Sequence, residues 1–100
     1  MEENMEFQLF NVSGTLINEP QLICKINARN YKDAFLRCKE ILSNGIKEEL
    51  AIAEGSKIEF TKLCKDLSLG YGEKVRYTTC SVSDENGFVI GTYDYAIAHA

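Results

Sequence analysis

The chain has 100 residues, of which 45% are hydrophobic, and its formal net charge is −4. This length suffices for one hydrophobic core and not for two. The small acidic excess excludes a strongly basic protein that binds nucleic acid through its overall charge. We expect a disordered leader at residues 1–5 and a single α+β domain at residues 6–98.

The N-terminal residues are acidic, and they lack the basic and apolar regions of a secretory signal. No stretch of the sequence approaches the roughly 18 apolar residues that a membrane-spanning helix requires. We therefore expect a cytoplasmic protein that has no membrane contact and keeps its cysteines reduced.

Residues 6–28 predict a β-hairpin, with a turn at residues 18–20. In the second strand the apolar residues alternate with polar ones, as in a sheet with one solvated face. The first strand is less regular, because its apolar residues would point to both faces of the sheet. A β-bulge near Asn11 or Gly14 would reconcile the two sets.

Residues 31–44 predict a helix, because their apolar positions form one continuous stripe. Asn30 is the expected N-cap, and Ser43, Asn44 and Gly45 predict a left-handed C-cap. The stripe consists of Tyr31, Ala34, Phe35, Cys38, Ile41 and Leu42.

Residues 56–68 predict a second helix. Ser56 and Glu59 have the spacing of a capping box, and Phe60, Leu63 and Cys64 begin an apolar face with helical spacing. Residues 46–54 fit either a helix or a short strand, because a short apolar run does not distinguish the two.

Residues 74–98 predict a second hairpin, with its turn at residues 83–87. Together these elements predict an antiparallel sheet of about four strands, made of two hairpins, with two helices packed on one face.

The four cysteines are Cys24, Cys38, Cys64 and Cys80. No two of them are close enough in sequence to form the chelating pair of a structural zinc site. Each falls at an apolar position of its segment, so we expect core residues, no metal and no cofactor.

The sequence offers little for catalysis, and we expect no enzyme. The single histidine, His99, lies at a terminus where fraying is expected. Cys80 shares a strand face with Lys74 and Arg76, whose charge could lower the pKa of its thiol. A cysteine-dependent enzyme is therefore one alternative.

A second alternative is a nucleic-acid-associated domain. Basic residues gather around the second strand and the first helix, where an α+β protein can present them to phosphates. Asp33 and Glu40 on the same helix oppose this interpretation. The basic residues are Lys25, Arg29, Lys32, Arg37 and Lys39.

The strongest candidate for a binding surface is the second hairpin. Its tyrosines are of the residue type enriched in binding hot spots, although tyrosines on a strand are also common in cores. A terminal strand could also offer an open edge to a partner or to a second copy of the chain. The candidate partner-binding residues are Tyr77, Tyr93, Asp94 and Tyr95.

A strand that runs into a capped amphipathic helix, from Ile26 through Ala34 to Cys38, resembles an arrangement in many small α+β proteins. These include inhibitors encoded by phages and mobile elements. Because the sequence carries no catalytic constellation, no metal motif and no phosphate loop, we predict a small non-catalytic protein-interaction module, a regulator or inhibitor that acts by occupying a partner protein. The resemblance adds one example of such a protein, an inhibitor encoded by a phage or mobile element.

Overall fold

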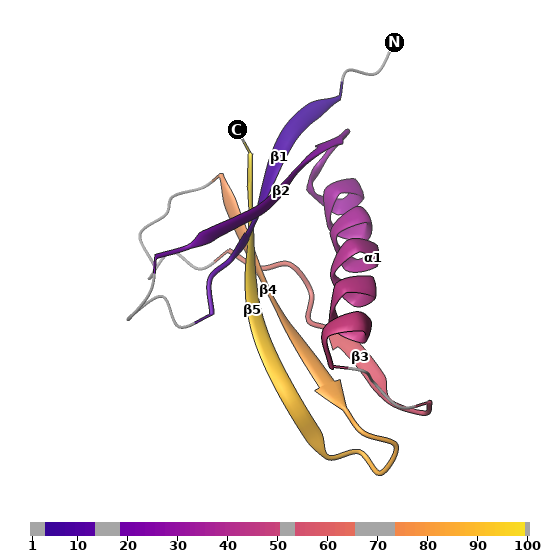
Figure 1. The fold of residues 1–100 in the computed structure, drawn as a ribbon. Coiled ribbons are helices and arrows are strands. Elements are labelled where there is room, and N and C mark those ends of the chain that lie inside the picture. Colours follow the sequence, from indigo (N-terminus) through magenta and orange to yellow (C-terminus); the bar gives the residue numbers. More distant parts are fainter. Residues whose placement is uncertain (1–3, 14–18, 51–53, 66–73, 100) are drawn as a thin grey trace.

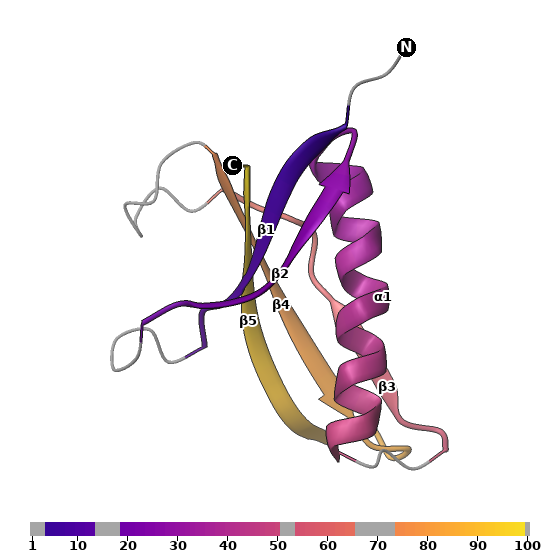
Figure 2. The ribbon, with the colours of Figure 1, turned by 45° about the horizontal axis from the view of Figure 1, so that its top comes forward.

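The computed structural model describes residues 4–13, 19–50, 54–65 and 74–99. Five strands form one antiparallel sheet in the order β2-β1-β5-β4-β3, and a helix lies across one face of it (Figures 1 and 2). This confirms the α+β class, with five strands instead of about four and, in the described ranges, one helix instead of two. The elements are β1 (Met5–Asn11), β2 (Gln21–Ala28), α1 (Tyr31–Leu50), β3 (Lys57–Phe60), β4 (Val75–Ser83) and β5 (Val89–His99).

The first hairpin is confirmed, but the expected bulge lies elsewhere. The β1–β2 register shifts between Leu9 and Phe10, which leaves Ile23 of β2 without a partner residue in β1. Gly14 lies outside the described residues. The apolar residues of β1 need no bulge in β1 itself, because each of its faces adjoins an apolar region: Leu9 belongs to the core beneath α1, and Phe10 lines a cavity on the opposite face.

The predicted helix is also confirmed, but α1 ends at Leu50 rather than at Asn44. Asn30 caps its start, since the backbone N–H of Asp33 donates to the Asn30 side chain at 2.8 Å. The C-cap prediction at Gly45 is wrong. Ile46, which is 4% exposed, continues the buried stripe and holds the next turn against the sheet.

The second predicted helix is wrong in the part that the structure describes. Lys57–Phe60 forms β3, and its residues pair with β4 from Ser83 to Cys80. Phe60 lies edge-on to Phe35 of α1, with ring centroids 6.4 Å apart. Of the ambiguous segment, residues 46–50 are helical; residues 51–53 and 66–68 lie outside the described ranges.

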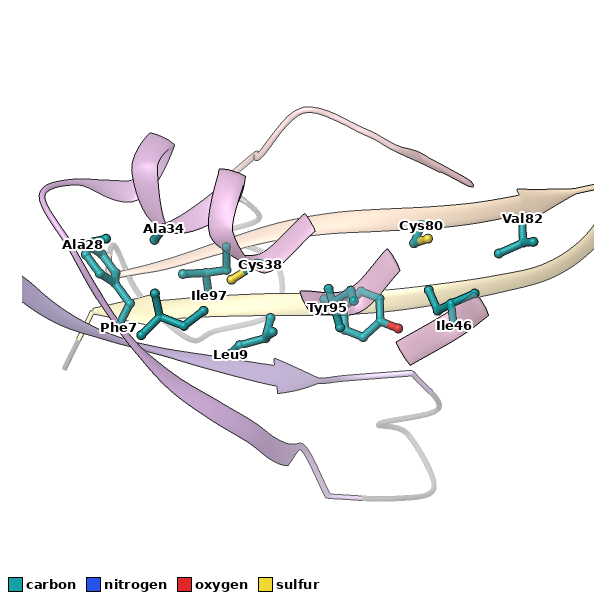
Figure 3. Packing of buried hydrophobic residues seen from close by; sticks show 12 residues of the cluster. Phe7, Leu9, Ala28, Ala34, Cys38, Ile46, Cys80, Val82, Tyr95 and Ile97 are labelled. Carbon is teal, nitrogen blue, oxygen red and sulfur yellow. The ribbon is translucent and has the colours of Figure 1, made fainter. Parts of the chain in front are cut away.

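The core lies between α1 and the sheet (Figure 3). β5 pairs with β1 on one side and with β4 on the other, so the last strand is central. The prediction that the terminal strand offers an open edge is therefore wrong along the stretch paired with β1. Buried residues of this core include Phe7, Leu9, Ala34, Cys38, Ile46, Cys80, Val82, Tyr95 and Ile97.

Candidate protein-binding surface

The turn between β4 and β5 is fixed by Asp84. One carboxylate oxygen of Asp84 accepts hydrogen bonds from the backbone N–H groups of Asn86 and Phe88, each at 2.9 Å. The backbone N–H of Asp84 also donates to the Phe88 carbonyl at 2.8 Å. Gly87 completes the turn with φ of 87°, a left-handed conformation that favours glycine. This network holds the turn in one defined shape.

Directly after this turn the chain exposes three large apolar residues in succession. Phe88 is 69% exposed, Val89 62% and Ile90 53%. Figure 1 shows that this end of the hairpin extends away from both chain termini. Contiguous apolar groups at a surface are typical of interaction sites. We call Phe88, Val89 and Ile90 the hairpin tip.

A neighbouring turn supports the hairpin tip from the side of β3. Gly55 has φ of 93°, and a Cβ added there would lie 3.2 Å from the Cβ of Glu85. This close approach brings the chain before β3 against the β4–β5 turn. A larger residue at Gly55 would strain the backbone and push the two turns apart.

The structure brings two of the predicted binding residues together, but inside the core. The rings of Tyr93 and Tyr95 stack on the α1 side of β5, with centroids 6.4 Å apart. Tyr95 is 4% exposed, and burial, with smaller contributions from Cys80, Tyr93 and Glu49, raises its pKa to about 12. Tyr93 is half-buried and packs against the same cluster.

The other two predicted residues lie on the opposite face of the sheet. Tyr77 is buried there, beside Ala96 of β5. Asp94 is exposed, and its carboxylate accepts a hydrogen bond from the Thr79 hydroxyl at 2.9 Å. The four residues therefore do not form one continuous surface. The sequence analysis missed the hairpin tip, although the apolar run that directly follows Gly87 is a signal that could have found it.

The face of the sheet opposite α1 carries an apolar cavity. Its volume is about 270 Å³, close to the lower size limit of small-molecule sites. Among the described lining residues, the Gln8 amide and the Tyr77 hydroxyl are the polar side-chain groups, so little in this part of the cavity would orient a polar ligand. The lining consists of Gln8, Phe10, Val12, Pro20, Val75, Tyr77, Ala96 and Ala98.

The cysteines are mostly core residues, as predicted. Cys38 is 1% exposed, and burial, followed by the charge of Cys24, raises its pKa to about 12. Cys80 is fully buried, and burial raises its pKa as well. The expectation that Lys74 and Arg76 lower the pKa of Cys80 is therefore wrong. Cys64 differs, since it is exposed and its thiol donates to the Tyr77 carbonyl at 3.6 Å.

His99 does not fray as expected. It lies within β5, its backbone N–H donates to the Lys74 carbonyl at 2.9 Å, and its ring packs against Phe7 with centroids 5.3 Å apart. Within the described ranges, no three His, Cys, Asp or Glu side chains gather closely enough to hold a metal ion.

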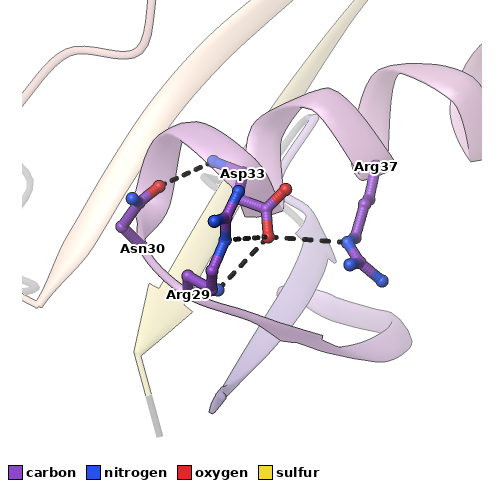
Figure 4. Close-up of polar contacts among 4 residues, drawn as sticks. All are labelled: Arg29, Asn30, Asp33 and Arg37. Carbon is purple, nitrogen blue, oxygen red and sulfur yellow. Dashed lines mark hydrogen bonds and ion pairs between the residues drawn. The ribbon is translucent and has the colours of Figure 1, made fainter. Parts of the chain in front are cut away.

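Two arginines, Arg29 just before α1 and Arg37 on it, share one carboxylate (Figure 4). The same oxygen of Asp33 lies 3.9 Å from Nε of Arg29 and 3.7 Å from Nε of Arg37. It also accepts the backbone N–H of Arg29 at 3.2 Å. A carboxylate between two guanidinium groups reduces the local positive charge that a phosphate would meet.

Two lysines of the same region also contact neighbouring side chains, one a carboxylate and the other an aromatic ring. The Nζ atom of Lys25 lies 3.7 Å from a carboxylate oxygen of Glu6 on β1. The Nζ atom of Lys39 lies 4.7 Å from the centre of the Phe35 ring. These contacts are weak individually, because both lysines remain accessible to water. Together with Asp33 they make the region less favourable for a polyanion than its sequence indicates.

Comparison with known proteins finds no match: no family model, no curated protein and no solved structure is significantly similar to the chain. Within the described residues, no helix combines the length and the apolar character needed to cross a bilayer.

Proposed function

We propose that this protein is a small non-catalytic interaction module that occupies a partner protein through its hairpin tip. The observation that supports this proposal is the exposure of Phe88, Val89 and Ile90 at the end of an ordered hairpin. Exposed aromatic and aliphatic groups at the end of a hairpin are suited to an apolar groove on a partner. A regulator or inhibitor of this kind needs a contact surface and no active site.

Energetics favour the hairpin tip as an anchor. Transfer of a Phe or Ile side chain from water to an apolar groove contributes about 1.5 to 3 kcal/mol. Loss of conformational freedom on binding opposes this gain. Here the opposing cost is small for the backbone, because the bonds from Asn86 and Phe88 to Asp84 already fix the turn.

Comparative affinity capture tests the proposal. Tagged wild-type protein, Phe88→Ser and Leu36→Ser are used as baits in lysate of the source cells, and captured proteins are quantified by mass spectrometry. Leu36 is a matched control, since it is 54% exposed but lies on α1. We expect at least one protein that the wild type and Leu36→Ser retain equally and that Phe88→Ser loses by roughly tenfold or more.

Two outcomes would contradict the proposal. One is a set of captured proteins that does not change with Phe88→Ser. The other is retention of nucleic acid, with binding that weakens steeply as salt is raised, because phosphate contacts release counterions and apolar contacts do not.

A further inference from the structure

One edge of the sheet has unpaired backbone groups. β2 is an outer strand, and among the described residues no strand pairs with its other side. Along a strand, successive residues direct their backbone N–H and C=O groups to opposite sides. The backbone N–H of Val12 donates to the carbonyl of Asp94 in β5 at 2.9 Å, so by alternation Phe7 and Leu9 of β1 direct their backbone groups toward β2.

The same alternation shows which residues of β2 direct their backbone groups toward β1 and which direct them outward. Ile26 and Cys24 are the partners of Phe7 and Leu9, so their backbone groups are used within the sheet. Lys25 and Asn27 must then direct their N–H and C=O groups outward. These groups are positioned to accept another extended strand.

A groove runs beside this edge, between β2 and α1. Its volume is about 390 Å³. Ile41, on the α1 wall, is 44% exposed, and Ile23 further along the strand is 42% exposed. The lining consists of Lys25, Ile26 and Asn27 from β2 and of Arg37, Glu40 and Ile41 from α1.

The β2 edge carries one lysine and one bulge of the kind that normally oppose strand addition, and the stretch from Cys24 to Ala28 contains no second charge, proline or bulge. Natural outer strands are blunted by proline, by several charges or by bulges. Pro20 precedes β2, and Lys25 is the one charged residue within the strand. The bulge at Ile23 leaves the part of β2 that follows it in regular register with β1.

We propose that the occupant of this edge is a second copy of the same chain, paired antiparallel through β2 about a two-fold axis. The two sheets would then form one continuous sheet. Both copies of α1 would lie on the same face of it, because α1 covers one face in each copy. The exposed Ile41 and Ile23 would be covered at the junction.

Charge in the groove favours this occupant. A two-fold interface places a surface against itself, so a patch of one sign would repel its copy. This groove contains both signs: the basic Lys25 and Arg37, which also lie 3.7 Å from Glu6 and Asp33 of the same chain, and the acidic Glu40. Glu40 of one copy can therefore face a basic residue of the other. An acidic or basic peptide would meet like charge at some of these positions.

The proposal is independent of the proposed function, because the hairpin tip and the β2 edge share no residue. A dimer formed through β2 would carry two hairpin tips. Avidity for a partner that offers two binding sites would follow from that arrangement.

Sedimentation velocity tests the dimer over protein concentrations from about 1 to 300 μM, spanning the affinities of transient and stable dimers. The wild type is compared with Ile41→Glu, with Asn27→Pro and with the control Leu36→Glu. Circular dichroism first establishes that each variant is folded. Leu36 suits the comparison because it is an exposed apolar residue of the same helix outside the groove.

We expect the wild type and Leu36→Glu to reach twice the 11.3 kDa mass of the chain within this range. Ile41→Glu and Asn27→Pro should weaken association by roughly tenfold or more, through buried charge and through loss of a backbone donor. A wild type that stays monomeric throughout would overturn the proposal. So would a dimer that Ile41→Glu leaves unchanged, and this second criterion holds even if Asn27→Pro fails to fold.

Discussion

Buried side chains that release a proton at alkaline pH have a direct consequence for stability. Cys38 and Tyr95 lie in the core between α1 and the sheet, and burial raises the pKa of each to about 12. Their ordinary values are 9.0 and 10.0. Above these values the unfolded chain loses protons that the folded protein retains, which favours unfolding.

The free energy of unfolding should therefore be unaffected by these two groups below pH 9, and should fall as pH rises from 9 toward about 12. Each group contributes a slope of at most about 1.4 kcal/mol per pH unit. Urea unfolding at a series of pH values measures this slope. In Cys38→Ala the decline between pH 9 and 10 should be shallower than in the wild type. Equal slopes in the two proteins would mean that Cys38 ionises as freely in the folded state as in the unfolded one.

The sequence predicted such core residues only where periodicity was clear. Cys38 and Leu42 fall on the helical stripe, and both are buried. Tyr95 and Phe88 could not be distinguished in this way, since both sides of β5 carry apolar residues. Which of them is covered depends on where α1 lies over the sheet, and α1 covers Tyr95 but does not reach the hairpin tip.

At the scale of elements, the helix α1 shows how packing overrides a local stop signal. Gly45 follows Ser43 and Asn44, a combination typical of a C-cap. The helix nevertheless continues, because Ile46 adds a further buried contact to the stripe. An added Cβ at Gly45 meets nothing within 4 Å.

Gly45→Ala should therefore stabilise the protein by about 0.5 to 1 kcal/mol, because alanine loses less backbone entropy in a helix. Thermal unfolding should show a melting temperature that is higher by a few degrees. Gly87→Ala is the matched control. With φ of 87° at that position, alanine should lower the melting temperature. A destabilising Gly45→Ala would instead indicate that the helix ends there.

The segment that forms β3 was predicted as part of a helix, but long-range pairing makes it a strand. The spacing of Phe60, Leu63 and Cys64 fits a helix as well as Ile58 and Phe60 fit a strand. Pairing with β4 decides between the two, since Ile58 lies opposite Val82 and Phe60 opposite Cys80 in the register. Such pairing depends on the position of β4, which the local sequence does not contain.

At the scale of the whole molecule, the order of the strands separates the core from the candidate binding surface. β5 joins the N-terminal hairpin to β4, and its half nearer the C-terminus is buried between β1 and β4. Its first residues extend past the β1 pairing and expose Val89 and Ile90. One strand thus contributes both core residues and exposed residues of the hairpin tip. The sequence predicted the second hairpin itself, which the structure confirms, but two of the residues predicted to bind a partner, Tyr77 and Tyr95, are buried.

The affinity of the hairpin tip for a captured partner is the measurement that tests this account most directly. Calorimetric titration would compare the wild type with Phe88→Ala, Ile90→Ala and the control Leu36→Ala. Each tip variant should lose about 1 to 3 kcal/mol of binding free energy, while its melting temperature stays within a few degrees of the wild type. Leu36→Ala should bind like the wild type. Full affinity in both tip variants, or a loss of equal size in Leu36→Ala, would contradict the assignment of binding to the hairpin tip.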